Sequence, residues 1–209
     1  MKNVLVISTS LRDMSNSERL ADAFIEGVKA AHHIVEKVTL KEKAISFCKG
    51  CLACQKTQKC VIKDDAAAIV EKMKNADILV FATPIYYYEM SGQLKTLLDR
   101  ANPLYTSDYA FREVYLLTTA AEEEISVPEK ATSGLMGWID CFEKAKLAGT
   151  VFAGGVNDMG DISGHCALEK AYQAGKGISM YKCQYKNVHF YIDIYKRWRT
   201  GSYGVQMNG

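Results

Sequence analysis

The sequence lacks a long hydrophobic run near its beginning. Its first apolar stretch, residues 4–7, is followed at once by Ser8, Thr9 and Ser10. Such a stretch is too short for the hydrophobic core of a signal peptide or for a membrane-spanning helix. We therefore expect a cytoplasmic protein that has no membrane partner.

The sequence also lacks a large excess of charge of either sign. It has 26 Lys and Arg residues against 24 Asp and Glu residues, a net charge of +2, which argues against an obligatory nucleic-acid partner. With 48% hydrophobic and 24% charged residues among 209, the composition is that of an ordinary globular protein. The length suits one domain, or one domain with an extension.

The C-terminal end differs from the rest of the chain. Residues 179–209 contain five basic residues and one acidic residue, so they carry +4 and the remainder carries −2. They also contain seven aromatic residues, which would be poorly soluble if exposed. We predict a domain over residues 1–178 and a basic aromatic extension over 179–209. The extension is expected to pack on a neighbouring subunit or over a ligand site, with nucleic-acid binding or an unstructured appendage as alternatives.

Short apolar strands alternate with amphipathic helices along the predicted domain. Strands are expected at residues 2–7, 34–40, 77–82, 114–117 and 149–153, and helices after about residue 17, from 64 or 65, and over 92–100, 133–146 and 164–177. Asn16 or Ser17 is expected to cap the first helix. Five strands alternating with five helices predict an α/β three-layer sandwich, in which helices cover both faces of a parallel sheet.

A sheet of this kind binds its ligand at the carboxyl ends of the strands, where the strand order reverses. This rule selects the loops at residues 8–17, 83–91, 118–128 and 154–163. The first of them lacks the glycine patterns of dinucleotide-binding and nucleoside-triphosphate-binding loops. It offers hydroxyl groups, Arg12 and Asn16 just before a helix, which suits a monophosphate group. The alternative is that these residues only cap the helix and end the strand.

The second of these loops is rich in tyrosine. Pro84 follows a buried strand, and three consecutive tyrosines occupy positions 86, 87 and 88, which cannot all point into a core. Aromatic side chains at a strand end offer a flat surface for a planar ring. In the alternative interpretation, one tyrosine belongs to the core, one to the surface and one to a subunit contact.

Four of the seven cysteines lie within one short segment. Cys48, Cys51, Cys54 and Cys60 have the spacing C-x2-C-x2-C-x5-C, which resembles ferredoxin-type loops more than the separated C-x2-C pairs of structural zinc sites. They are candidate ligands of a 4Fe–4S cluster, although the last interval is long and no proline follows Cys60. The alternative is a structural or redox-sensitive thiol loop without metal.

Two segments together resemble the NADPH-dependent FMN reductase-like family. Residues 9–17 are similar to its phosphate loop, with Thr9 and Ser15 where glycines are usual, and residues 83–100 (TPIYYYEMSGQLKTLLDR) match its second motif at nearly every fixed position. The resemblance covers about residues 2–178. It implies a flavodoxin-like fold with five strands in the order 2-1-3-4-5, and a homodimer or homotetramer.

The resemblance also implies where FMN would bind. The phosphate would be held by residues of the first loop, the isoalloxazine ring by the second, and the other edge of the ring by the third, where the usual glycines are missing. The residues concerned are Ser10, Arg12, Ser15, Asn16 and Ser17; Pro84, Ile85, Tyr86, Tyr87, Ser91 and Gly92; and Thr118, Thr119 and Ala120.

An FMN-dependent oxidoreductase is the implied activity, with electrons passing from NAD(P)H or another donor to a small acceptor such as a quinone, a free flavin or an azo or nitro compound. No catalytic side chain is expected, because the flavin carries the chemistry. The alternative is a non-enzymatic electron carrier of flavodoxin type. The cysteine spacing resembles the iron–sulfur flavoprotein branch of the family, in which a cluster would exchange single electrons with FMN.

Overall fold

The computed structural model describes residues 1–179, and Met1–Ile178 forms one compact unit. The expectations for the extension, from residue 180 onward, lie outside the described residues. Within them, no helix is both long enough and apolar enough to span a bilayer.

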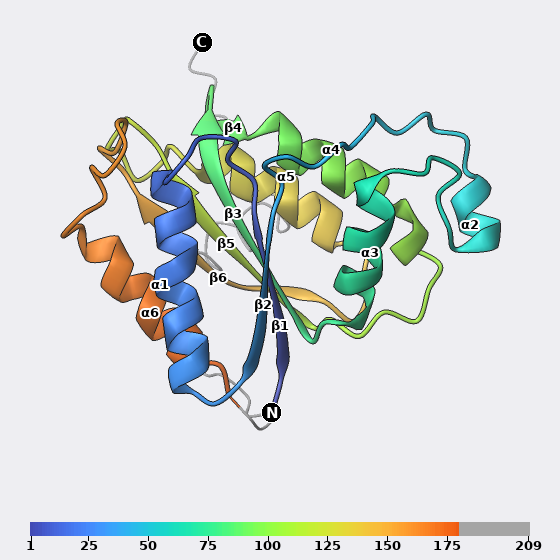
Figure 1. Cartoon of the computed structure of the whole chain (residues 1–209), viewed down its shortest axis with the longest axis horizontal. Helices are drawn as coiled ribbons and strands as arrows, with labels where there is room; N and C mark the ends of the chain where they lie inside the picture. Colours follow the sequence, from blue (N-terminus) through green and yellow to red (C-terminus); the bar gives the residue numbers. More distant parts are fainter. Residues whose placement is uncertain (180–209) are drawn as a thin grey trace, which may run out of the picture. The chain divides into compact units, whose positions relative to one another are not determined.

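Five parallel strands form the main sheet (Figure 1). They are β1 (Asn3–Ser8), β2 (Ile34–Thr39), β3 (Ile78–Tyr86), β5 (Glu113–Thr119) and β6 (Lys146–Ala153), in the spatial order β2-β1-β3-β5-β6. This is the predicted order 2-1-3-4-5, and the flavodoxin-like architecture is confirmed. The described sheet has six strands rather than five, because the short β4 (Glu89–Met90) pairs antiparallel with the end of β3.

Helices cover both faces of the sheet, as Figure 1 shows. α1 (Asn16–Ala30) and α6 (Cys166–Lys176) lie on one face; α3 (Asp65–Asn75), α4 (Gly92–Arg100) and α5 (Glu129–Ile139) lie on the other. Two short helices, α2 (Ala53–Thr57) in the cysteine segment and η1 (Asn102–Leu104) after α4, complete the described elements.

Alternation along the central strands divides the core in two. In β1, Val4 and Val6 pack with α1 and α6, whereas Leu5 and Ile7 pack with the helices of the opposite face. All four are almost fully buried. Successive side chains of a strand point to opposite faces, so a strand covered on both sides needs the continuous apolar run seen in the sequence.

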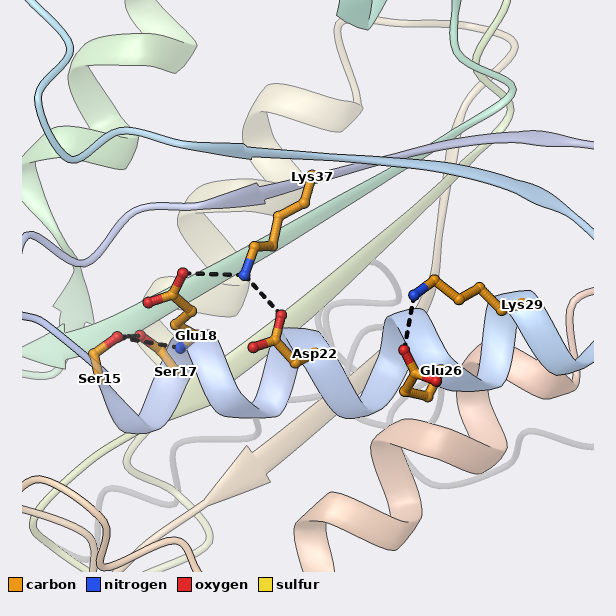
Figure 2. A network of polar contacts seen from close by, with 7 residues as sticks. All are labelled: Ser15, Ser17, Glu18, Asp22, Glu26, Lys29 and Lys37. Carbon is orange, nitrogen blue, oxygen red and sulfur yellow. Dashed lines mark hydrogen bonds and ion pairs between the residues drawn. The ribbon is translucent and has the colours of Figure 1, made fainter.

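The edge strand β2 is tied to α1 by charge (Figure 2). Lys37 Nζ lies 3.0 Å from Glu18 Oε1 and 2.7 Å from Asp22 Oδ1. Partial burial lowers the pKa of Lys37, but the hydrogen bonds with Asp22 and Glu18 outweigh it and the pKa is raised. Figure 2 draws both of these ion pairs, which join the edge strand to α1.

The predicted cap of the first helix was one or two residues too late. Ser15 is the N-cap, and its Oγ accepts a hydrogen bond of 3.2 Å from the backbone N–H of Glu18. A serine followed three residues later by glutamate is the sequence pattern of a capping box. The correction matters for the site, because it leaves the Asn16 side chain free to contact another loop.

The boundaries after β5 also differ from the prediction. α5 covers Glu129–Ile139 rather than residues 133–146, and β6 begins at Lys146 rather than at residue 149. Phe142 is buried in the core after the helix has ended, so the apolar periodicity continues through a turn. Lys146 then pairs with Glu113 in the sheet.

Candidate functional site

A cavity of about 140 Å³ lies at the carboxyl ends of the parallel strands. All four loops selected by the strand-end rule contribute to it. Its lining residues are Ser10, Arg12, Asp13, Ser15, Asn16, Ser17, Pro84, Ile85, Tyr86, Thr119, Ala120, Ala121, Val156, Asn157, Asp158 and Met159. We call it the strand-end cavity.

The structure brings most of the predicted ligand-binding residues to this cavity. Ten of them line it: Ser10, Arg12, Ser15, Asn16, Ser17, Pro84, Ile85, Tyr86, Thr119 and Ala120. The other four do not. Tyr87 is 99% exposed, Thr118 is buried and its Oγ1 donates 3.4 Å to the carbonyl oxygen of Val151, and Ser91 and Gly92 form the start of α4.

Sequence reasoning named no residue of the fourth loop, although it selected that loop. Val156, Asn157, Asp158 and Met159 line the strand-end cavity from there, and Asp13 and Ala121 were also missed. The position of the loop after a parallel strand was the available indication, because these residue types carry no pattern typical of phosphate or ring binding.

The first loop places hydroxyl groups and a cation at the N-terminus of α1. Ser10, Ser15 and Ser17 are buried. Arg12 Nη1 donates 3.0 Å to the carbonyl oxygen of Asn157, and Asn16 Nδ2 donates 2.8 Å to that of Asp158. The first and fourth loops are thus joined around a helix end, where unpaired N–H groups and the helix dipole favour an anion.

Three buried hydroxyl groups fix the base of the tyrosine loop. Ser91 Oγ lies 3.0 Å from Thr9 Oγ1 and 3.1 Å from Thr83 Oγ1, and the Ser91 N–H donates 3.1 Å to Thr83 Oγ1. Ser91 Oγ also accepts from the N–H of Leu94 and so caps α4. Ser91 therefore acts on the site by holding the loop, not by lining the cavity.

The tip of this loop is a strained two-residue turn. Ile85 pairs with Met90 and Tyr86 with Glu89, which leaves Tyr87 and Tyr88 as the turn, with φ of 51° and 66°. Two consecutive positive φ values are typical of a type I′ turn, which favours Asn-Gly. Residues with a Cβ are sterically strained in this conformation. The two tyrosines therefore lower the stability of the folded state at this turn.

The remaining loops are packed against one another. A hydrogen bond with the Glu122 carboxylate raises the pKa of Tyr88 and joins the second loop to the third. A Cβ at Gly154 would lie 2.7 Å from the carbonyl oxygen of Glu122, so the close approach of the third and fourth loops requires glycine. The N–H of Gly155 donates 3.2 Å to the same oxygen.

A second, larger cavity of about 480 Å³ lies beside the cysteine segment. Cys48, Cys51, Cys54 and Cys60 all line it, and Cys141 joins them from the end of α5. The rest of the lining includes aromatic side chains of Tyr105, Trp138 and Phe142. We call it the cysteine cavity; it shares no lining residue with the strand-end cavity.

Comparison with known proteins gives the family. The model of the NADPH-dependent FMN reductase family matches residues 2–158. The chain belongs to the NADPH-dependent FMN reductase family. This membership supports FMN as the cofactor.

Relatives of this family member include iron–sulfur flavoproteins. One from Methanocaldococcus jannaschii is 36% identical over 101 residues, which cover 48% of this chain and 52% of the relative. One from Methanosarcina thermophila is 29% identical over 164 residues, or 78% of this chain and 83% of the relative. The chain spans about half the length of several of the curated relatives that it matches.

A solved structure shows the same fold. The NAD(P)H:quinone oxidoreductase from Methanothermobacter marburgensis has a TM-score of 0.69 and 20% identity to this FMN reductase family member, covering 88% of this chain and 99% of that one.

The cysteine thiols of this family member are of the ligand type that an iron–sulfur cluster needs, but they are not arranged as a metal site. Across residues 1–179, no group of three or more His, Cys, Asp or Glu side chains is arranged to hold a metal ion. Cys48 and Cys51 are exposed, while Cys54 is buried and its Sγ accepts 3.1 Å from Asn102 Nδ2. All four cysteines of the motif line one cavity, but ligation of a cluster would require them to rearrange.

Proposed function

We propose that the strand-end cavity binds FMN and that the protein is an NAD(P)H-dependent oxidoreductase with a small acceptor. The observation that supports this most is that ten residues implied by the family resemblance, from three separate loops, line one cavity at the N-terminus of α1. FMN, when bound, would supply two-electron and one-electron chemistry between the nicotinamide donor and the acceptor.

The chain's own residues would bind and orient the cofactor. Ser10, Ser15, Ser17 and the first N–H groups of α1 would donate to the phosphate, and Arg12 would add positive charge. Pro84, Ile85 and Tyr86 of the β3 end would contact the ring. The Thr83–Ser91 hydrogen bonds would hold that segment still, so the ring would meet a preformed surface.

The acceptor is proposed to be a small molecule such as a quinone, a flavin or an azo or nitro compound. Tyr86, Tyr87 and Tyr88 are all exposed at the rim of this region, and aromatic surface suits planar molecules. A homodimer or homotetramer is proposed as well. Tyr87 exposes a large aromatic side chain at the strained turn, and exposed aromatic surface of this kind is suited to contact with another subunit.

Anaerobic stopped-flow reduction tests the activity. The protein loaded with FMN is mixed with NADPH or NADH, and the loss of flavin absorbance is followed before and after addition of a quinone. Rapid bleaching by a nicotinamide and recovery with the quinone support the enzyme. If neither nicotinamide bleaches the flavin but a reduced ferredoxin does, the protein is an electron carrier and the enzyme proposal fails.

We also propose a 4Fe–4S cluster held by Cys48, Cys51, Cys54 and Cys60, which would exchange single electrons with FMN. The support is that all four thiols of the motif line one cavity, together with the iron–sulfur flavoproteins among the relatives. Within residues 1–179 no group of three or more of these side chains is arranged to hold a metal ion, so cluster binding would require the loop to rearrange.

Iron and acid-labile sulfide assays after anaerobic reconstitution test the cluster. Cys141 lines the same cavity but lies outside the motif, so Cys141→Ala is a matched control for Cys51→Ala. We expect about four irons per chain in the wild type and in C141A, and much less in C51A with FMN retained. Absence of iron from the wild type, or equal iron in both variants, would contradict the proposal.

A further inference from the structure

Arg100 ends the second family motif but lines neither cavity. It is 2% exposed, and its side chain is completely buried. A buried guanidinium is costly unless it is paired and hydrogen-bonded. The groups that bind the Arg100 side chain therefore indicate its role.

Those partners lie at the two ends of the cysteine segment. Arg100 Nη1 donates 2.7 Å to the carbonyl oxygen of Ser46, and Nη2 donates 3.2 Å to that of Ile62. Ser46 precedes Cys48 by two residues, and Ile62 follows Cys60 by two. One side chain thus joins the two backbone segments that enter and leave the four-cysteine loop.

Asp64 completes the clamp. Its carboxylate accepts 2.6 Å from Arg100 Nη1 and 2.9 Å from Nη2. It also accepts from the N–H of Ser46 at 2.8 Å and from that of Ala66 at 3.1 Å, the latter as the N-cap of α3. The entry and exit of the loop are therefore fixed to α3 and α4 through one ion pair.

The fifth N–H donor of the Arg100 guanidinium, on Nε, is buried and makes no hydrogen bond with the described residues. Arg100 Nη2 donates to the carbonyl oxygen of Ile62, two residues after Cys60, so the Cys60 thiol is held beside that side chain. Hydrogen bonding with Asp64 and, after it, with the Cys60 thiol raises the pKa of Arg100. A buried donor without an acceptor is unfavourable, and a nearby thiolate would supply the acceptor.

We propose that Arg100 is a positioning residue of the cysteine cavity, clamping both ends of the loop through Ser46, Ile62 and Asp64 and directing its Nε–H at Cys60. This rests on the proposed cluster for its function. When Cys60 is a thiolate ligand, the Nε–H donates a hydrogen bond to its sulfur. A charged donor to a ligand sulfur stabilises the reduced, more negative state of a cluster, so it raises the reduction potential.

Arg100→Lys tests the proposal, because lysine keeps the charge but cannot bridge four acceptors or donate from Nε. Lys95→Met is the matched control: it removes an exposed cation of the same helix, paired with Asp99. After anaerobic reconstitution, we expect R100K to lose iron to a chelator about tenfold faster than wild type and K95M, and to have a more negative cluster potential in a dye titration. FMN binding serves as the check of folding. Wild-type rates and potential in R100K would overturn the proposal.

Asp64→Asn separates the two parts of the role and replaces R100K if that variant does not fold. It weakens the clamp but keeps Nε, so iron loss should quicken while the potential stays near the wild-type value. A wild-type rate of iron loss in D64N would overturn the clamp.

Metal-free protein gives a readout that does not need the cluster. Cys60 labelling by a thiol reagent, followed by peptide mass spectrometry, should be several-fold faster in R100K and D64N than in wild type and K95M, because the loop opens. If the wild type binds no iron but this difference is found, the proposed cluster fails and the clamp stands. Equal labelling in all four proteins overturns the clamp.

Discussion

Arg12 is the one cationic side chain among the described residues that line the strand-end cavity. It is exposed, and its side chain hydrogen-bonds to the backbone of Asn157, so it can turn toward an anion at little cost. Hydrogen bonds to charged groups contribute more than neutral ones. Arg12 should therefore act on the phosphate of FMN and hardly on the ring.

Arg12→Ala is expected to weaken FMN binding by about 10–100-fold, the loss of a charged hydrogen bond of about 1.5–3 kcal/mol. Riboflavin, which has no phosphate, should bind equally to the variant and to the wild type. Fluorescence titration measures both affinities. Arg19→Ala is the control, since Arg19 lies on α1 but bonds to Ser163 outside the cavity lining. An equal loss of riboflavin affinity would show that Arg12 does not act on the phosphate.

Asp64 predicts a pH dependence of stability. Its hydrogen bond from Arg100 lowers the pKa of the carboxyl, against the opposite effect of burial, and the N–H of Ser46 lowers it further. Because the pKa is lower in the folded than in the unfolded state, the group stabilises the fold above the unfolded value of 3.8, and this stabilisation is lost as the pH falls through the folded pKa.

Asp64→Asn should therefore lower the free energy of unfolding by about 3 kcal/mol at pH 7, because it leaves a buried arginine without its counter-ion. The deficit should shrink as the pH falls below about 4, because the Asp64 carboxyl of the unfolded wild type then takes up a proton while that of the folded protein stays ionised down to its lowered pKa. Urea unfolding at several pH values measures both. A deficit that is independent of pH from 7 to 3 would contradict this account of Asp64.

At the scale of elements, the two tyrosines of the β3–β4 turn should make the folded state less stable than a turn of residues that favour positive φ. Replacing Tyr87 and Tyr88 together by Asn and Gly should raise the free energy of unfolding by about 1–3 kcal/mol, because these residues adopt positive φ readily. Urea or thermal unfolding measures it. Tyr105→Asn is the control, since Tyr105 is also exposed but has an ordinary φ of −56°. A less stable turn variant would show that contacts of the tyrosines outweigh the strain.

Sequence patterns predicted the strands that are buried on both faces and the helices that are buried along one regular face. Continuous apolar runs located β1 and β3, and Gly92–Arg100 was predicted with its observed bounds. The end of α5 was missed because Phe142 remains buried after the helix has ended. The short α2 was also not predicted, since its five residues contain too little periodicity to indicate a helix.

The candidate site was predictable where residue types are informative. Hydroxyls, Arg12 and Tyr86 pointed to the cavity, but spacing alone could not tell that Ser91 holds the loop and Thr118 faces the sheet. Likewise, the cysteine spacing identified the segment but not Arg100, because the residues it joins lie 54 and 38 positions away in the chain.

At the scale of the whole molecule, the described domain carries two separate cavities. One is lined by the four strand-end loops, and the other is lined by the cysteine segment that contains α2. Figure 1 shows α2 on the flank opposite α1 and α6. The first cavity is formed by loops at the carboxyl ends of the parallel strands. The second depends on a loop fixed at its two ends by Arg100 and Asp64.

The central claim is that the strand-end cavity binds FMN, and gel filtration with a recorded visible spectrum tests it most directly. The protein is mixed with excess FMN, separated from free flavin and compared with the Arg12→Ala variant. We predict flavin absorbance that travels with the wild-type protein at about one FMN per chain, and clearly less with the variant. Wild-type protein that elutes without flavin absorbance would contradict the account.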